Sequence, residues 1–129
     1  MRKTKTFVSF DHRHDEDLLH DLLVESRLAD SPFVIEDWSL HEDLSGDWQK
    51  KLQERLRQVE LLVVLCGERT GEAMSVTAEL WMAQQQGIPY VLLSGRAGRP
   101  CQKPSGAKDH DLLYEWTWTN VKALARGSR

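Results

Sequence analysis

The chain has 129 residues, a length that suits one hydrophobic core, so we expect a single domain over residues 1–129. Hydrophobic residues make up 40% and charged residues 29%, as is typical of soluble globular proteins. The formal net charge is −3, and basic and acidic side chains are mixed along the chain, so no basic stripe favours a nucleic-acid partner.

The chain begins with a predicted strand and helix. The segment KTFVSF at residues 5–10 is rich in aromatic and β-branched residues, which indicates a strand. The polar segment that follows leads into a helix with Asp15 as its capping residue. The apolar positions of that helix recur at helical spacing, and they are Leu18, Leu19, Leu22 and Leu23.

A second strand and helix follow Pro32, which ends the first helix because proline disfavours helix at the residue before it. The segment FVIEDW at residues 33–38 predicts a strand. A polar loop then leads to a helix with Ser45 as its cap. The apolar stripe of this helix is spaced by four, four and three residues, at Trp48, Leu52, Leu56 and Val59.

A continuously apolar run, LLVVLCG at residues 61–67, predicts a strand that helices cover on both faces. It is far too short to cross a bilayer, and the N-terminus lacks the apolar core of a signal peptide. We therefore expect a cytoplasmic protein without a membrane partner. Residues 74–86 predict a helix that Gly87 ends, and residues 88–95 predict a fourth strand.

The C-terminal part begins with the longest predicted loop, residues 96–111, which is rich in glycine and proline. A short edge strand is expected within residues 112–116, followed by a helix that Thr117 or Thr119 caps. The alternation of strands and helices predicts a flavodoxin-like α/β fold in three layers. Its mainly parallel five-stranded sheet carries helices on both faces.

Ligands of such sheets bind over the carboxyl ends of the strands. Here the loops at that edge are residues 11–15, 39–46, 67–74 and 95–111. Three protein classes with this layout are disfavoured. The third strand lacks the terminal aspartate of a response-regulator receiver, the acidic loop after the first strand would repel a flavin phosphate, and no Rossmann or P-loop glycine pattern is present.

Three segments resemble TIR (Toll/interleukin-1 receptor) domains, in the same order. KTFVSFDHRHDED is similar to the first TIR box, and VELLVVLCGERTGEAMSVTAELWMA is similar to the third strand, its loop and the third helix. LLYEWTWTNVKALAR is similar to the C-terminal end of the bacterial branch, which includes the signal-producing TIR proteins of the Thoeris anti-phage system. The resemblance covers nearly the whole chain and implies a TIR-like fold.

Glu79 is the catalytic residue that the resemblance implies, because TIR enzymes carry a catalytic glutamate in their third helix. The implied reaction cleaves the nicotinamide–ribose bond of NAD, which is a substrate and not a cofactor, and it needs no metal. A fixed carboxylate stabilises the positive charge that develops on the ribose. Capture of that cation gives ADP-ribose or a cyclic isomer. From position alone, a solvated helix residue is the simpler interpretation of Glu79.

The resemblance also implies contacts with the nucleotide at the ends of the first two strands. Phe10 and Asp11 end the first strand, with Phe10 either a stacking surface or a core residue. Trp38 and Ser39 begin the loop after the second strand. In TIR enzymes that loop takes part in assembly, so we expect a homo-oligomer through residues 39–47. The resemblance to anti-phage proteins also implies a phage-derived trigger.

Two further predicted contacts lie near the third strand. Gly67 opens the loop after that strand, and Ser75 lies one turn before Glu79 on the same helix face. The TIR pattern has tryptophan at the position of Ser75, so the wall of the pocket differs here. An exposed Trp81, on another face of this helix, would mark a protein contact.

Other interpretations stay open. A non-catalytic TIR-like scaffold is one, motivated by the missing aromatic at Ser75. A nucleoside deoxyribosyltransferase-like enzyme is another, because it shares the sheet layout and the glycosidic chemistry. A third feature, the segment HRHDED, offers side chains that a metal could use, but an acidic helix start is the simpler interpretation. Those side chains are His12, His14, Asp15 and Asp17.

Overall fold

The computed structural model describes residues 2–40 and 46–127. Its strands are β1 (Thr4–Ser9), β2 (Phe33–Trp38), β3 (Leu61–Cys66), β4 (Tyr90–Ser94) and β5 (Leu113–Glu115). Its helices are α1 (Glu16–Ser26), α2 (Trp48–Leu56), α3 (Met74–Gln86) and α4 (Trp118–Ala125), with a short 3₁₀ helix, η1 (Thr70–Glu72), before α3.

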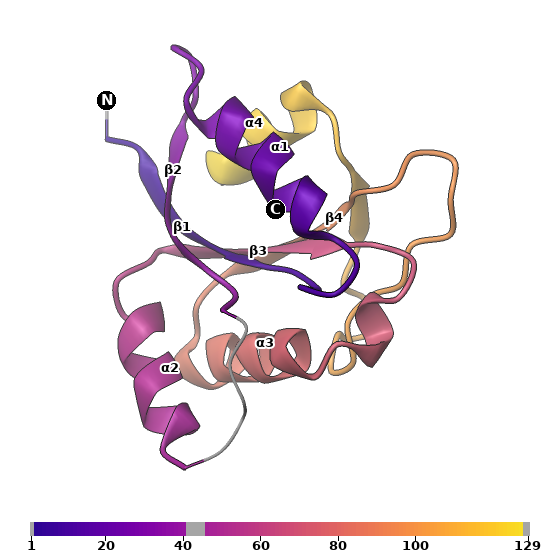
Figure 1. Cartoon of the computed structure of the whole chain (residues 1–129). Helices are drawn as coiled ribbons and strands as arrows, with labels where there is room; N and C mark the ends of the chain where they lie inside the picture. Colours follow the sequence, from indigo (N-terminus) through magenta and orange to yellow (C-terminus); the bar gives the residue numbers. More distant parts are fainter. Residues whose placement is uncertain (1, 41–45, 128–129) are drawn as a thin grey trace.

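The strands form one sheet in the order β2-β1-β3-β4-β5, and all neighbouring strands are parallel. Helices α1 and α4 cover one face of the sheet, and α2 and α3 cover the other (Figure 1). The predicted three-layer α/β fold is therefore confirmed. The strand order reverses between β1 and β3, and crevices at such a switch point are where open parallel sheets bind ligands.

The alternation of side chains along β1 divides the core into two parts. Val8 and Phe10 point to the α1 and α4 side, whereas Phe7 packs with α2 and α3 on the other side. β3 is buried at every position, as its unbroken apolar sequence predicted, because helices cover it on both faces. The sheet is thus a wall between two hydrophobic layers.

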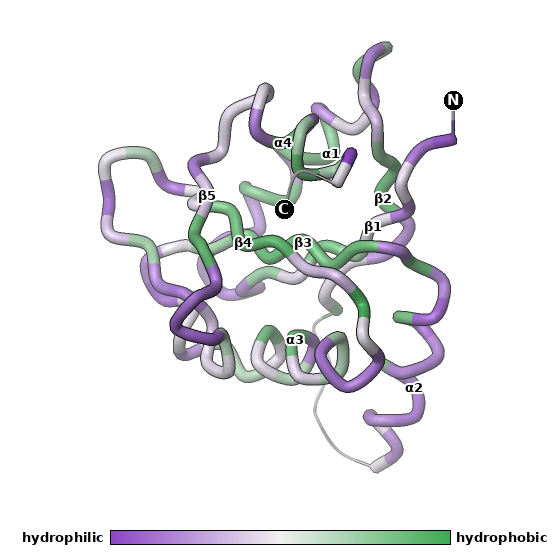
Figure 2. Tube along the Cα trace, turned by 180° about the vertical axis from the view of Figure 1, so that it is seen from behind, coloured by the Kyte–Doolittle hydropathy of each residue, from purple (hydrophilic) through white to green (hydrophobic). Residues whose placement is uncertain are grey.

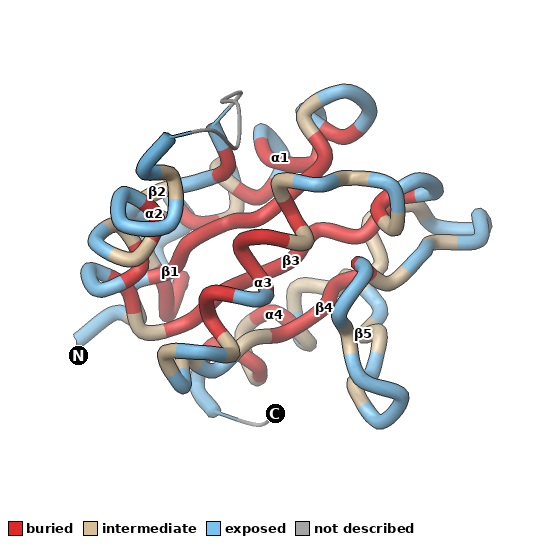
Figure 3. Tube along the Cα trace, turned by 90° about the horizontal axis from the view of Figure 1, so that it is seen from below, coloured by how far each residue is buried: buried red, intermediate tan, exposed pale blue. Residues whose placement is uncertain are grey.

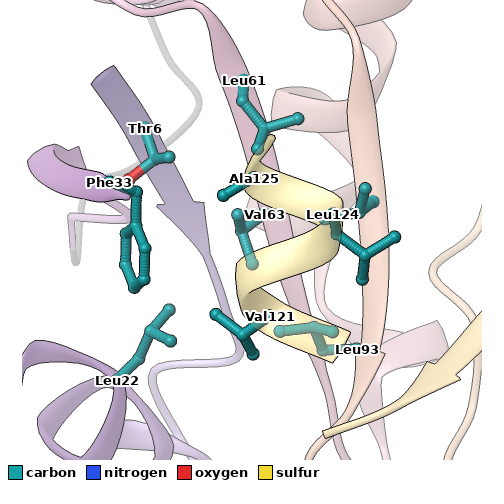
Figure 4. Close-up of a pocket in the computed structure, with 10 residues that line it drawn as sticks. Thr6, Leu22, Phe33, Leu61, Val63, Leu93, Val121, Leu124 and Ala125 are labelled. Atoms are coloured by element: carbon teal, nitrogen blue, oxygen red, sulfur yellow. The ribbon is translucent and has the colours of Figure 1, made fainter. Parts of the chain in front are cut away.

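The α1 and α4 side of the core contains a small gap of about 10 Å³ (Figure 4). A water molecule needs roughly 10–15 Å³ of such space and several polar partners. The side chains that surround the gap are almost all apolar, including Leu22, Phe33, Val63 and Val121. This gap is a feature of packing and not a ligand site.

The predicted bounds of β2 and α3 agree with the structure at both ends, and those of the other four strands differ from it by at most two residues. Thr117 caps α4, since its Oγ1 accepts from the backbone nitrogen of Asn120 at 3.1 Å. Asp15 occupies the cap position of α1, but the prediction of a side-chain cap is wrong, because its carboxylate bonds to Arg96 instead. Ser45 lies outside the described residues. Among the helices described, none has the length and apolar character needed to cross a membrane.

Candidate functional site

Glu79 lies on the side of α3 that faces the sheet, and only 4% of it is exposed. Its Oε1 accepts hydrogen bonds from the hydroxyls of Ser9, at 2.6 Å, and Ser39, at 2.5 Å. Ser9 ends β1 and Ser39 directly follows β2, so the carboxylate lies at the carboxyl edge of the sheet. A solvated helix residue, the alternative that position alone favoured, does not describe Glu79.

The backbone explains why two serines converge on one carboxylate. Ser9 is two residues after Phe7 and shares its face of the strand, which is the face that α3 covers. Ser39 extends the pairing of β1 with β2, because its backbone nitrogen donates to the carbonyl of Val8 at 2.9 Å. The Ser39 hydroxyl also accepts from the backbone nitrogen of Phe10, at 3.0 Å. It is therefore fixed between β1 and Glu79.

Burial raises the pKa of Glu79 to about 7, although the hydroxyls of Ser39 and Ser9 oppose this shift. The guanidinium of Arg55, on α2, also lowers this pKa, and Asp37 raises it. Arg55 binds both carboxylate oxygens of Asp37, at 2.8 and 2.9 Å. The Glu79 carboxyl group therefore changes charge near neutral pH, as functional carboxylates in buried sites often do.

Three other predicted contact residues follow β1 or end β2, and their surroundings differ. Phe10 is wholly buried in the core under α1, the alternative that the sequence left open. Asp11 is buried and organises the loop after β1, since its carboxylate accepts from the Arg13 backbone nitrogen at 2.9 Å and from His14 Nδ1 at 2.7 Å. Trp38 is 36% exposed at the end of β2.

The remaining predicted contacts lie after β3. Gly67 is buried, and its backbone nitrogen donates to Thr70 Oγ1 at 2.7 Å. Ser75 is partly buried in the first turn of α3. The predicted assembly loop, residues 39–47, includes residues 41–45, which lie outside the described residues. Assembly through that loop stays a prediction.

Asp15 is a second buried carboxylate at this edge, with 2% of its surface exposed. Its Oδ1 accepts from Nη2 of Arg96 at 3.0 Å, and Arg96 also pairs with Asp17 at 2.6 Å. Burial raises the pKa of Asp15, and the guanidinium of Arg96 opposes that shift. A Cβ atom placed on Gly67 would lie 2.3 Å from Oδ2 of Asp15, so the carboxylate fills the space that a side chain there would need.

Gly67→Ala is therefore expected to lower the free energy of unfolding by about 1–3 kcal/mol, the usual cost of overpacking a close contact. Urea unfolding measures the loss. Gly71→Ala is the control, because its Cβ would meet only the end of the flexible Gln102 side chain within 3 Å. Asp15→Ala should recover part of the loss in the Gly67→Ala background, since it removes the colliding group. Additive losses would contradict this contact.

The sequence interpretation missed three residues of the site, namely Ser9, Asp37 and Arg55. Ser9 carried a signal, because alternation along residues 5–10 puts it on the same face as Phe7. Arg55 carried none, since a basic residue on an amphipathic helix is ordinarily solvated. The guanidinium carbon of Arg55 lies 5.1 Å from the centroid of the Phe7 ring. This contact depends on how α2 packs against β1.

The surface of the protein has two open clefts. One, of about 420 Å³, lies between α1 and the loop after β4, near Glu25, Arg96 and Trp116. The other, of about 480 Å³, lies along the outer side of α3. Glu79 lines neither cleft. Within residues 2–40 and 46–127, no group of three or more His, Cys, Asp or Glu side chains could hold a metal ion, so the segment HRHDED forms no such cluster there.

Comparison with protein families matches residues 7–95 to the family described as Thoeris protein ThsB, TIR-like domain. The matched range is more than half of the chain and contains all three residues of the hydrogen-bonded cluster, Ser9, Ser39 and Glu79. It agrees with the resemblance inferred from the sequence. A search of curated proteins finds no match.

Proposed function

Because the chain belongs to the TIR-like domain family of Thoeris protein ThsB, a family of anti-phage defence, we propose that it cleaves NAD in that defence. The observation that carries the proposal is the Glu79 carboxylate, buried at the carboxyl edge and held by two hydroxyl groups. Helix α3 is also where the resemblance places a catalytic glutamate. The bond cleaved is the one between nicotinamide and ribose.

In this reaction the electron pair of the C–N glycosidic bond leaves with the nicotinamide ring, which departs as a neutral molecule. Positive charge then develops on the ribose. The Glu79 carboxylate stabilises that charge most strongly in the transition state, because a fixed charge in a water-excluded place needs no reorganisation. A nucleophile on the same molecule then closes a cyclic ADP-ribose isomer, or water gives ADP-ribose.

The hydroxyl groups of Ser9 and Ser39, which donate to Glu79, support a proposal for how the substrate is held. Oε1 already accepts from two hydroxyls, which are the same kind of donor that a ribose ring presents. We propose that a ribose hydroxyl takes the place of the Ser39 hydroxyl when NAD binds. In this proposal, the structure with Glu79 buried is the resting state of the protein, and a phage-derived trigger activates it.

The direct test is release of nicotinamide from NAD by the purified protein, measured with and without an extract of phage-infected cells. Cleavage in the triggered sample supports the proposal. Complete absence of release under triggered conditions, from protein that unfolds cooperatively, would contradict it. Free nucleosides tested in the same assay distinguish NAD cleavage from deoxyribosyl transfer, because a deoxyribosyltransferase accepts them.

Ser9→Ala is expected to shift the pH dependence of this cleavage upward. The variant loses one donor to the ionised carboxylate, so the pKa of Glu79 rises further and ionisation requires a higher pH. Hydrogen bonds to charged groups contribute roughly 1.5–3 kcal/mol, which corresponds to a shift of about 1–2 pH units. The midpoint of the rate against pH measures the shift. Ser26→Ala is the control, because that buried hydroxyl donates to its own helix. An unchanged midpoint in Ser9→Ala would contradict this role.

A non-catalytic scaffold is the second candidate function. The observation that favours it is that Glu79 lines none of the three cavities described above. A side chain that only fills space between β1 and α3 needs no access to a ligand. In that case the triggered protein would bind a protein partner and leave NAD intact.

A further inference from the structure

Arg55 joins helix α2 to the end of strand β2. Its Nε and Nη2 donate to the two carboxylate oxygens of Asp37, at 2.8 and 2.9 Å, and Nη2 also donates to the carbonyl of Trp38 at 2.6 Å. Both side chains of the pair are partly buried, with 23% of Arg55 and 29% of Asp37 exposed. An arginine that binds both oxygens of a carboxylate has a defined geometry, so the guanidinium is fixed in place.

The fixed guanidinium lies beside the cluster that holds Glu79. The carbonyl that it binds belongs to Trp38, and the next residue along the chain is Ser39, which donates to Glu79. Its Cζ lies 5.1 Å from the centroid of the Phe7 ring, and Phe7 shares its face of β1 with Ser9, the other donor to Glu79. The guanidinium therefore adjoins the cluster from both β1 and β2.

Helix α2 is otherwise a hydrophilic surface helix. It is largely purple in hydropathy, whereas most of α3 is white to green (Figure 2). Most of α2 is exposed or half-buried, whereas β1 is buried along most of its length (Figure 3). The other charged residues of α2, namely Lys50, Lys51 and Glu54, are exposed. Arg55 differs from them because it contacts both β1 and β2.

Two charged groups act on the buried carboxyl group of Glu79. The guanidinium of Arg55 lowers the pKa of Glu79, and the carboxylate of Asp37 raises it. Because these two groups are bonded to each other, each one limits the effect of the other. The Asp37–Arg55 pair is thus a partly buried dipole beside a carboxyl group that changes charge near neutral pH.

Other titratable groups lie on the elements around this cluster. Lys5 of β1 and Glu36 of β2 are exposed, so solvent screens their charges. In β3, burial raises the pKa of the Cys66 thiol, which therefore stays neutral. The ring of His12, in the loop after β1, bonds to the carbonyl of Ser39. A direct measurement on Glu79 is needed to separate its ionisation from that of His12.

The proposed reaction requires Glu79 in its charged form, because the carboxylate stabilises a cationic ribose. Burial opposes that form, and a fixed positive charge beside the cluster favours it. This effect remains when a ribose hydroxyl replaces the hydroxyl of Ser39. We propose that Arg55 is the positioning residue that keeps Glu79 charged for NAD cleavage, and that Asp37 both orients Arg55 and limits its effect. This inference rests on the proposed function.

The first experiment follows the side-chain carboxyl carbon of Glu79 by NMR as the pH is changed, without NAD or trigger. Arg55→Met should raise the pKa of Glu79 by about 0.5–1 pH unit, less than loss of an unpaired contacting charge, because the guanidinium already faces Asp37. Asp37→Asn should lower this pKa, since asparagine keeps an acceptor oxygen for Arg55 but carries no charge. Arg57→Met is the matched control, because Arg57 is exposed at the end of α2 and should leave the pKa unchanged.

The second experiment measures triggered nicotinamide release against pH for the same variants. The midpoint of the rate should move to higher pH in Arg55→Met and to lower pH in Asp37→Asn. Arg55→Lys should lie between the wild type and Arg55→Met, because lysine keeps the positive charge but cannot bind both carboxylate oxygens and the carbonyl in one geometry. Loss of packing alone would not move the midpoint in opposite directions at two bonded residues.

The proposal is overturned if the pKa of Glu79 is the same in the wild type and Arg55→Met, or if Arg55→Met and Asp37→Asn shift it in the same direction. It is also overturned if the pKa shifts but the midpoint of the rate does not. If Arg55→Met does not unfold cooperatively in urea, Arg55→Lys and Asp37→Asn decide in its place. A protein that cleaves no NAD would contradict the proposed function, whereas the NMR titration tests the control of Glu79 separately.

Discussion

Glu79→Gln is expected to reduce the triggered rate of NAD cleavage by at least about 100-fold. The amide keeps an acceptor oxygen for the hydroxyls of Ser9 and Ser39 and nearly the same volume, but it carries no charge. Removing one preorganised group that stabilises transition-state charge lowers the rate by a factor of about 10²–10³. We expect the loss of a full buried charge to lie at the upper end of this range. The variant therefore removes electrostatic stabilisation and leaves the packing in place.

The measurement is nicotinamide release at saturating NAD, where the loss should appear in kcat because the charge develops in the transition state. Glu54→Gln is the matched control, since it makes the same change at an exposed position on α2 and should leave the rate unchanged. Equal rates for the wild type and Glu79→Gln under triggered conditions would exclude catalysis by this carboxylate and would favour the scaffold.

The second large effect concerns stability against pH. The pKa of Glu79 is raised from 4.5 to about 7 in the folded protein, so the folded state keeps this proton over a range in which the unfolded chain has lost it. Because the unfolded state binds fewer protons between these values, stability falls as pH rises from about 4.5 to about 7. The size of the fall is about 3 kcal/mol for this one group.

Glu79→Gln should abolish this component of the pH dependence. The free energy of unfolding of the variant relative to the wild type should therefore rise by about 3 kcal/mol between pH 4.5 and pH 8.5. Urea unfolding of both proteins across this range measures it, and the other titrating groups cancel in the difference. Parallel profiles for the two proteins would mean that the carboxyl group ionises as freely in the folded state as in the unfolded chain.

These two predictions are linked by one physical cause. A carboxylate that is expensive to bury persists where a protein needs its charge in a place without water, and this is how active sites often reduce stability. A glutamine variant that is inactive but more stable at alkaline pH would show that the same carboxylate supports catalysis and lowers stability. A variant that is more stable but binds the same partners would indicate a scaffold that retains the glutamate.

Local pattern determined much of the fold. The bounds of β2 and α3 were predicted at both ends, because Pro32 stops helix before β2 and Gly87, with its left-handed backbone, ends α3. The unbroken apolar run of β3 predicted a strand buried on both faces. The position of Glu79 in the third helix, at the carboxyl edge of the sheet, also followed from the order of elements alone.

Tertiary structure decided which hydrogen-bond partners the polar side chains have. The Asp15 carboxylate could have capped α1 locally, yet it bonds to Arg96, which is 81 residues away. Ser39 and Glu79 are 40 residues apart, and their contact requires β2 to lie beside β1 in one register. Hydrophobic periodicity reports only which face of an element is buried, so the sequence by itself determined the elements and their layers. The convergence of Ser9, Ser39 and Glu79 depends on packing between elements, because the hydrogen bonds that select partners form only after those layers meet.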